Sequence, residues 1–110
     1  MKVLFYRSGS GRVPVQDFIE TLSFEDKALF TEVKMGIESY GLSYPRAAFR
    51  QLKGKLWEIR FSAPGGKYRV AYVLLEAERM VWLPGFRKET QRTPRNDLNL
   101  ALRRLKEVVQ

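Results

Sequence analysis

The sequence predicts a single α+β domain in which helices pack on an antiparallel sheet. Two observations predict this class. Three strand-like runs separated by short turns follow one another at residues 56–62, 67–75 and 79–86, and amphipathic helical patterns stand before and after them. The expected order is strand, two helices, three strands and a final helix, with the two N-terminal helices on one face of the sheet. At 110 residues the chain has room for one core, so residues 1–110 are expected to form one domain.

The N-terminal elements are predicted from start signals and apolar spacing. Residues 2–6 are predicted as a strand and residues 8–12 as a flexible turn. Pro14 suits the first position of a helix, which continues with apolar residues at helical spacing: Val15, Phe18, Ile19 and Leu22. Ser23 is a good N-cap for a second helix, which Gly41 is expected to end.

The C-terminal half is more basic and less regular at its start. Residues 41–55 are predicted to be irregular, and the third strand-like run is expected to end at Pro84 and Gly85. Thr93 and Pro94 are a strong start signal for the last helix. Its expected apolar face consists of Leu98, Ala101, Leu102, Leu105 and Val109.

The net charge of +8 is concentrated in one part of the chain. Residues 1–40 hold five Lys and Arg against six Asp and Glu, whereas residues 41–110 hold fifteen against six. An arginine-rich cationic segment favours a phosphate-bearing partner, because the planar guanidinium group makes paired hydrogen bonds to phosphate oxygens. The alternative is an ordinary solvated surface.

The chain contains no cysteine and no histidine. The first absence removes disulfides and cysteine-bound metals, and the second removes the commonest metal ligand and the side chain best suited to proton transfer near neutral pH. Any catalysis is therefore expected to use carboxylates, lysines, arginines, tyrosines or hydroxyls, without a metal or another cofactor. No segment is apolar enough for a signal peptide or a membrane span, so a cytoplasmic protein with no membrane partner is expected.

The alternation of apolar residues fixes an expected register between two strands. A short turn at Pro64 and Gly65 places Arg60 directly opposite Arg69, on the face away from the aromatic core. Two facing arginines on a solvent-exposed side repel each other unless an anion lies between them. The alternatives are that they splay into solvent, or that Glu58 and Glu89 neutralise them.

A polar connection, residues 85–94, leads from the last strand to the last helix. Its hydrogen-bond donors are Arg87, Lys88, Gln91, Arg92 and Thr93, and amides at the helix start would add more. Arg87 is expected to converge with Arg69, because the end of the third strand lies near the start of the second. The alternative is an ordinary charged loop. Tyr44 and Phe49 are the aromatic residues best placed to stack on bases.

Three segments carry a resemblance to a known family: LKGKLWEIRF, the hairpin GGKYRVAYVL, and LPGFRKETQRTPRNDLNLALRRLKE. Together they resemble the HigB-like, phage-derived branch of the RelE/ParE toxin superfamily. The resemblance implies a type II toxin–antitoxin toxin with a RelE-like fold, which enters the ribosomal A site and cleaves mRNA. It also implies a small antitoxin partner, in this branch usually a helix-turn-helix DNA-binding protein.

The resemblance also implies a set of site residues. Arg60, Arg69, Arg87 and Lys88 match basic positions of the family's site, whereas Glu58 and Thr93 stand where RelE has a lysine and, nearby, a tyrosine. The candidate catalytic residues are Arg60, Arg69, Arg87, Lys88 and Glu58, with proton transfer assigned to Glu58, Glu89 or Lys88. The candidate RNA-binding residues are Lys53, Lys55, Lys67, Gln91, Arg92 and Arg95.

The sequence is also consistent with two other functions. A ParE-like member would poison DNA gyrase through protein contacts. A basic module that binds RNA or the ribosome would need no catalytic residue. An arginine cluster on one surface favours the nuclease, because a gyrase poison needs no group that stabilises a phosphate undergoing cleavage.

Overall fold

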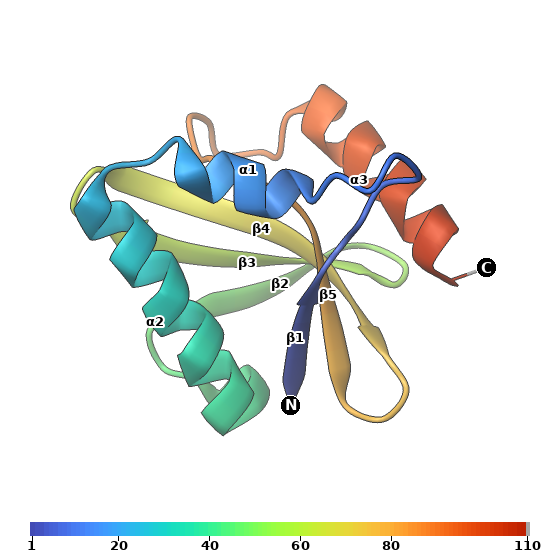
Figure 1. Ribbon diagram of the computed structural model, residues 1–110, viewed down its shortest axis with the longest axis horizontal. Helices are drawn as coiled ribbons and strands as arrows, with labels where there is room; N and C mark the ends of the chain where they lie inside the picture. Colours follow the sequence, from blue (N-terminus) through green and yellow to red (C-terminus); the bar gives the residue numbers. More distant parts are fainter. Residues whose placement is uncertain (110) are drawn as a thin grey trace.

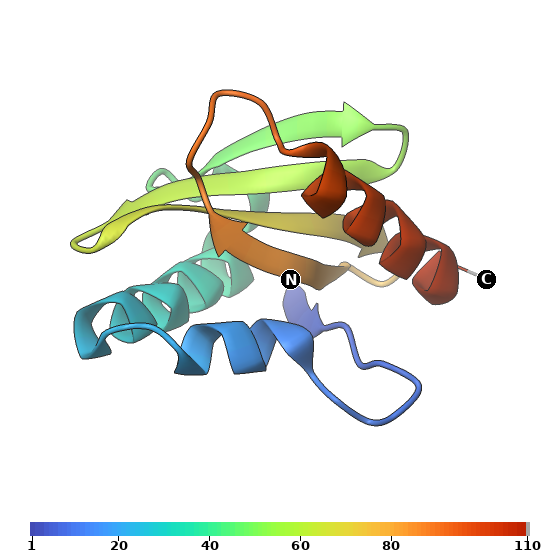
Figure 2. The ribbon, with the colours of Figure 1, turned by 90° about the horizontal axis from the view of Figure 1, so that it is seen from above.

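The computed structural model describes residues 1–109, which form a five-stranded sheet with helices on both faces (Figures 1 and 2). In chain order the elements are β1 (Lys2–Phe5), α1 (Pro14–Glu20), α2 (Phe24–Tyr40), a 3-10 turn (Gly41–Ser43), β2 (Ala48–Lys53), β3 (Leu56–Ala63), β4 (Gly66–Leu75), β5 (Arg79–Arg87) and α3 (Arg95–Val109). Helices α1 and α2 cover one face and α3 covers part of the other, as Figure 2 shows. The predicted α+β class and the pairing of the two N-terminal helices on one face are confirmed.

The sheet is mixed rather than wholly antiparallel. Its strand order is β1-β5-β4-β3-β2, and β2 to β5 form an antiparallel meander. β1 lies parallel to β5 at one edge, with Lys2 opposite Arg79. The chain between β1 and β2, which contains α1 and α2, therefore crosses one face of the sheet from edge to edge.

β2 is a strand that the sequence pattern conceals, because residues 41–55 were expected to be irregular. Phe49 packs with the core under α1 and α2, whereas Leu52 packs on the opposite side with α3. A register shift between Gln51 and Lys53 lies at this point. The bulge spoils the period-two alternation that would otherwise have revealed a strand.

β5 continues beyond Pro84 and Gly85, where it was expected to end. The register of β4 against β5 shifts between Val70 and Tyr72, so the proline lies in an irregular stretch where its missing N–H breaks no regular pairing. A Cβ on Gly85 would lie 3.2 Å from the Phe18 ring, so the absence of a side chain lets α1 approach closely. The extension adds residues 86 and 87 to the sheet, and it decides which way their side chains point.

The two faces of the sheet carry separate apolar clusters. Under α1 and α2 lies an aromatic core of which Phe30, Tyr68 and Trp82 are part. Under α3 lies a smaller cluster, in which Val108 takes the place expected for Val109. The predicted ends of α2 are confirmed, since the Ser23 side chain accepts a hydrogen bond from the Asp26 amide and Gly41 has a φ of 61°. α1 ends at Glu20, before the predicted Leu22.

Neither proposed stacking residue presents a free ring. Tyr44 is buried against Gly36, where a Cβ would overlap the tyrosine ring. Phe49 packs edge-on against Tyr72, with 6.2 Å between ring centroids. Both residues therefore serve the core, and the expectation that they stack on bases is wrong for this conformation. Among residues 1–109, no helix is long and apolar enough to cross a lipid bilayer.

Candidate nucleic-acid interface

A buried carboxylate and a buried guanidinium lie together on the α3 side of the sheet. The predicted register is confirmed, since Arg60 pairs with Arg69 across β3 and β4. The side chains of Glu58 and Arg69 are both 0% exposed, and 3.7 Å separates Arg69 Nε from Glu58 Oε1. The same carboxylate oxygen accepts a hydrogen bond of 2.7 Å from Arg60 Nε. Glu58 therefore neutralises the facing arginines.

Arg69 is clamped by the segment that joins β5 to α3, which arches over the sheet in Figure 2. Its Nη2 donates to the carbonyl oxygens of Thr90 at 2.6 Å and Gln91 at 2.8 Å. Its Nη1 donates to Thr93 Oγ1 at 3.2 Å, and that hydroxyl donates to Glu58 Oε2 at 2.6 Å. The expectation of a solvent-exposed, repelling pair is therefore wrong, because a loop distant in sequence folds back over Arg69.

The electrostatics of Arg69 follow from this enclosure. Burial lowers the pKa of its guanidinium, because the charged form loses its hydration. The nearby Glu58 carboxylate acts in the opposite direction and stabilises the charge. Carbonyl oxygens of the segment take up hydrogen bonds that a phosphate would otherwise receive. In this geometry Arg69 organises the segment and is not presented to a ligand.

Four other cations surround the buried pair and form what we call the cationic face: Arg50, Arg60, Lys67 and Lys88. The register places Arg50 opposite Glu58, and the alternation of β4 places Lys67 on the side of Arg69. The amide of Lys88 donates to the Lys67 carbonyl at 2.8 Å, which brings the two lysines together. α3 packs over the other half of this side of the sheet. Arg50 and Lys67 are exposed and Arg60 and Lys88 are half-buried, so the cationic face is accessible beside the segment that covers Arg69.

The Lys88 side chain lies in a strongly positive environment. Partial burial lowers its pKa, and the positive charges of Lys67, Arg69 and Arg60 lower it further. The Glu58 carboxylate acts in the opposite direction and raises the pKa of Lys88. The lowered pKa increases the fraction of Lys88 that is a neutral amine, which is the form that accepts a proton.

Arg87 lies apart from the cationic face, so its expected convergence with Arg69 is wrong. Because β5 continues past Gly85, Phe86 pairs with Arg69 and Arg87 pairs with Tyr68. Arg87 consequently points to the side of α1 and α2. Its guanidinium carbon lies 5.0 Å from the centroid of the Tyr68 ring, and its Nη1 donates to the Gly65 carbonyl at 3.1 Å.

The candidate RNA-binding residues fall into separate places. Lys67 belongs to the cationic face. Gln91, Arg92 and Arg95 are exposed around the start of α3, and the Gln91 carbonyl accepts a hydrogen bond of 3.4 Å from Arg60 Nη2. Lys53 and Lys55 lie beside the β2–β3 turn, at the other end of β3 from Lys67. Eight residues of strand separate the two ends, which is roughly 25 Å.

Sequence reasoning missed Arg50 of the cationic face and Asp97, a carboxyl group close to Arg69. Arg50 lay in a segment expected to be irregular, although its basic charge was visible. Asp97 lies in the first turn of α3, where burial raises the pKa of its carboxyl, nearby Glu89 raises it further and Arg69 lowers it. Asp97 therefore adds a carboxyl group close to the buried Arg69.

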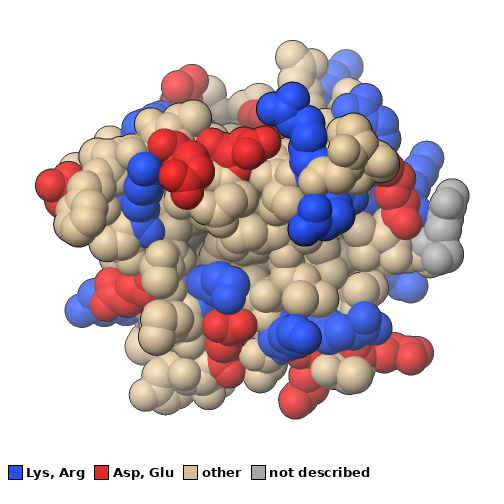
Figure 3. Space-filling view, in the orientation of Figure 1, with Lys and Arg blue, Asp and Glu red and all other residues tan. Residues whose placement is uncertain are grey.

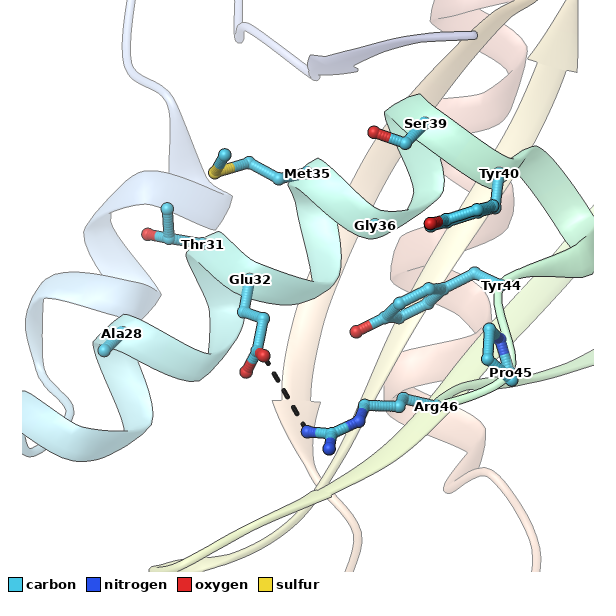
Figure 4. Close-up of a pocket in the computed structure, with 10 residues that line it drawn as sticks. All are labelled: Ala28, Thr31, Glu32, Met35, Gly36, Ser39, Tyr40, Tyr44, Pro45 and Arg46. Carbon is cyan, nitrogen blue, oxygen red and sulfur yellow. Dashed lines mark ion pairs between the residues drawn. The ribbon is translucent and has the colours of Figure 1, made fainter.

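The opposite side of the molecule has a different character. Figure 3, drawn in the orientation of Figure 1, shows acidic and basic side chains interspersed over the side that carries α1 and α2. A groove of about 820 Å³ runs along the outside of α2, where Met35, Tyr40 and Tyr44 line it beside an ion pair of 3.7 Å between Glu32 and Arg46 (Figure 4). It contains none of the candidate site residues.

Comparison of the sequence with models of known protein families finds a match that covers most of the chain. Residues 17–106 match the family described as phage derived protein Gp49-like (DUF891). The matched range contains α2, the whole β2–β5 meander and the segment over Arg69. No curated protein sequence matches the chain.

Proposed function

Because the chain belongs to the Gp49-like family of phage-derived proteins, we propose that it is the toxin of a type II toxin–antitoxin system and a ribosome-dependent mRNA endoribonuclease. The resemblance of residues 50–108 to RelE/HigB-like toxins supports this proposal. So does the cationic face, an open surface of arginine and lysine suited to a phosphate backbone. The proposed partners are the ribosome, its mRNA and an antitoxin with a helix-turn-helix DNA-binding domain.

The observation that carries the proposal is the grouping of two reactive cations beside a fixed ion pair. Arg60 retains 22% side-chain exposure. Its Nε donates to Glu58 and its Nη2 donates to the Gln91 carbonyl at 3.4 Å, so the N–H groups of Nη1 are the ones that can meet a phosphate. Lys88 lies nearby with a lowered pKa. Together they suit attack by a 2′-hydroxyl on the adjacent phosphate, which requires no metal. The new bond from the 2′-oxygen to phosphorus replaces the bond to the 5′-oxygen, which takes a proton from water, so one fragment ends in a 2′,3′-cyclic phosphate and the other in a 5′-hydroxyl.

The roles differ between the candidate catalytic residues. Arg60 binds the phosphate and stabilises the negative charge that grows on it during attack. Lys88, as a neutral amine, takes the proton of the 2′-hydroxyl. Glu58 is less suited to that step, because it is fully buried and its two oxygens already accept hydrogen bonds from Arg60 and Thr93. Glu58 and Arg69 instead fix the position of Arg60 and of the segment above it.

A need for the ribosome follows from the incompleteness of this site. Few groups on the cationic face can hold the sugar in line with the phosphate, and in-line geometry accounts for much of such a reaction. A ribosome that presents the mRNA in a fixed conformation supplies that geometry. In this proposal the exposed Gln91, Arg92 and Arg95 contact the RNA backbone, and Lys53 and Lys55 contact RNA farther away.

Expression of the protein without antitoxin is expected to arrest growth and to produce cuts in translated messages. Primer extension on mRNA from such cells measures this, with an untranslated copy of the same message as the control. Cuts confined to the translated reading frame support the proposal. Intact mRNA together with double-strand DNA breaks identifies a gyrase poison, and growth arrest with neither lesion identifies a basic module that binds RNA or the ribosome without cleavage.

A further inference from the structure

A second buried carboxylate lies on the opposite side of the sheet from Glu58. Asp26, in the first turn of α2, is 1% exposed. Its Oδ1 accepts a hydrogen bond of 2.9 Å from the Gly65 amide, and its Oδ2 accepts one of 2.5 Å from the Tyr68 hydroxyl. Both partners belong to the hairpin of β3 and β4, so one side chain of α2 binds the hairpin at its turn.

Asp26 and its two partners, Gly65 and Tyr68, are tightly packed. A Cβ on Gly65 would lie 2.3 Å from Asp26 Oδ2, so only glycine allows this approach. The Tyr68 ring is fully buried and packs edge-on against Phe18 and Phe30. Burial raises the pKa of Tyr68 to about 12, and the hydrogen bond to Asp26 contributes to the shift. The hydroxyl therefore keeps its proton near neutral pH and remains a donor to Asp26.

The same two hairpin residues also hold Arg87. Its guanidinium lies over the Tyr68 ring and donates to the Gly65 carbonyl, while Asp26 takes the Gly65 amide and the Tyr68 hydroxyl. The peptide groups of Gly65 are thus bound from α2 and from the end of β5. Two residues beyond Gly65, the Lys67 carbonyl accepts a hydrogen bond from the amide of Lys88.

We propose that Asp26 is a positioning residue that sets the β3–β4 turn and, through it, the place of Lys67 and Lys88 on the cationic face. Asp26 touches neither lysine, and the link passes through Gly65, Tyr68 and the backbone bond between Lys67 and Lys88. Arg87 has a positioning role in the same network. The consequence for RNA cleavage rests on the proposed function, whereas the consequence for the turn does not.

The structural part is tested by hydrogen exchange, which requires no RNA. Asp26→Asn keeps the size of the side chain but removes its charge, and Tyr68→Phe removes only the hydroxyl. Both variants are expected to speed exchange of the Lys88 amide, which neither side chain contacts. Asp17→Asn is the matched control, because Asp17 is an exposed carboxylate in the first turn of α1 and pairs only with Arg12, at 3.6 Å. Wild-type exchange at Lys88 in both variants would overturn the proposal.

The functional part is tested by cleavage of ribosome-bound mRNA at a temperature where thermal melts show every variant to be folded. Misplacement of Lys88 is expected to lower kcat by about 10–100-fold for Asp26→Asn, with KM for the programmed ribosome nearly unchanged. An unchanged kcat would show that Asp26 serves stability alone. If the wild type itself does not cleave, the nuclease proposal fails, while faster Lys88 exchange in the variants still supports the role of Asp26 in the turn.

Discussion

Replacing Arg69 with methionine is expected to lower the free energy of unfolding by about 1–3 kcal/mol, because the buried Glu58 carboxylate keeps its ion pair with Arg60 but loses the one with Arg69. The substitution also removes the donors that hold the carbonyls of Thr90 and Gln91. Urea denaturation of the two proteins measures the effect. Arg103→Met is the matched control, since Arg103 is exposed on α3 and its loss is expected to change stability by no more than about 0.5 kcal/mol.

A second substitution separates the ion pair from simple packing. In the double variant Arg69→Met with Glu58→Gln, the buried negative charge is gone, so stability is expected to recover in part. Equal stability of Arg69→Met and the wild type would contradict the buried pair and would restore the view that the facing arginines repel each other. A double variant no more stable than the single one would assign the loss to packing alone.

Replacing Lys88 with arginine is expected to lower mRNA cleavage by about 10²–10⁴-fold, which is the usual contribution of a general base. Arginine keeps the positive charge but stays protonated at accessible pH, so it cannot take the proton of the 2′-hydroxyl. The wild-type rate is expected to rise with pH as Lys88 loses its proton and to level off above its lowered pKa. The variant is expected to lose this rise. Measured pH–rate profiles on programmed ribosomes give both results.

Arg60→Gln serves as the comparison for that experiment. Loss of its charge is expected to lower the rate by about 10²–10³-fold without removing the rise with pH, since Arg60 stabilises charge and transfers no proton. If Lys88→Arg instead cleaves at the wild-type rate, Lys88 contributes charge only. The proton acceptor would then have to be found among the carboxylates near Arg69. Asp97 is the first candidate, because burial and the nearby Glu89 raise the pKa of its carboxyl group.

The sequence could predict the register of the central hairpin but not its environment. Strict alternation and a short turn leave one pairing that buries the aromatic side chains, so Arg60 had to face Arg69. Whether that side of the sheet is open depends on residues 88–94, whose path is set by hydrogen bonds to Arg69 itself. Residues 88–94 show no periodic pattern from which their path over Arg69 could be predicted.

Local irregularities explain why two strand predictions were wrong, namely the absence of β2 and the early end of β5. β2 and the end of β5 each contain a register shift, and a bulge breaks the alternation on which strand prediction depends. Because of the register shift in β5, the Arg87 side chain points to the face of the sheet that α1 and α2 cover, where it contacts Tyr68. The role of Asp26 as a buried hydrogen-bond acceptor could in part have been predicted from the sequence. Tyr68 was expected to face the core, and a buried tyrosine hydroxyl usually requires a partner.

The chemistry of the cleaved RNA ends tests the central claim most directly. The claim is that Arg60 and Lys88 promote attack by a 2′-hydroxyl on its own phosphate. The measurement is mass spectrometry of the fragments that purified protein releases from mRNA on programmed ribosomes, with the Arg60→Gln, Lys88→Gln double variant as the control. The wild type is expected to release fragments with 2′,3′-cyclic phosphate ends, and the control is expected to release none. Fragments that end in a free 3′-hydroxyl, or equal cleavage by the control, would contradict it.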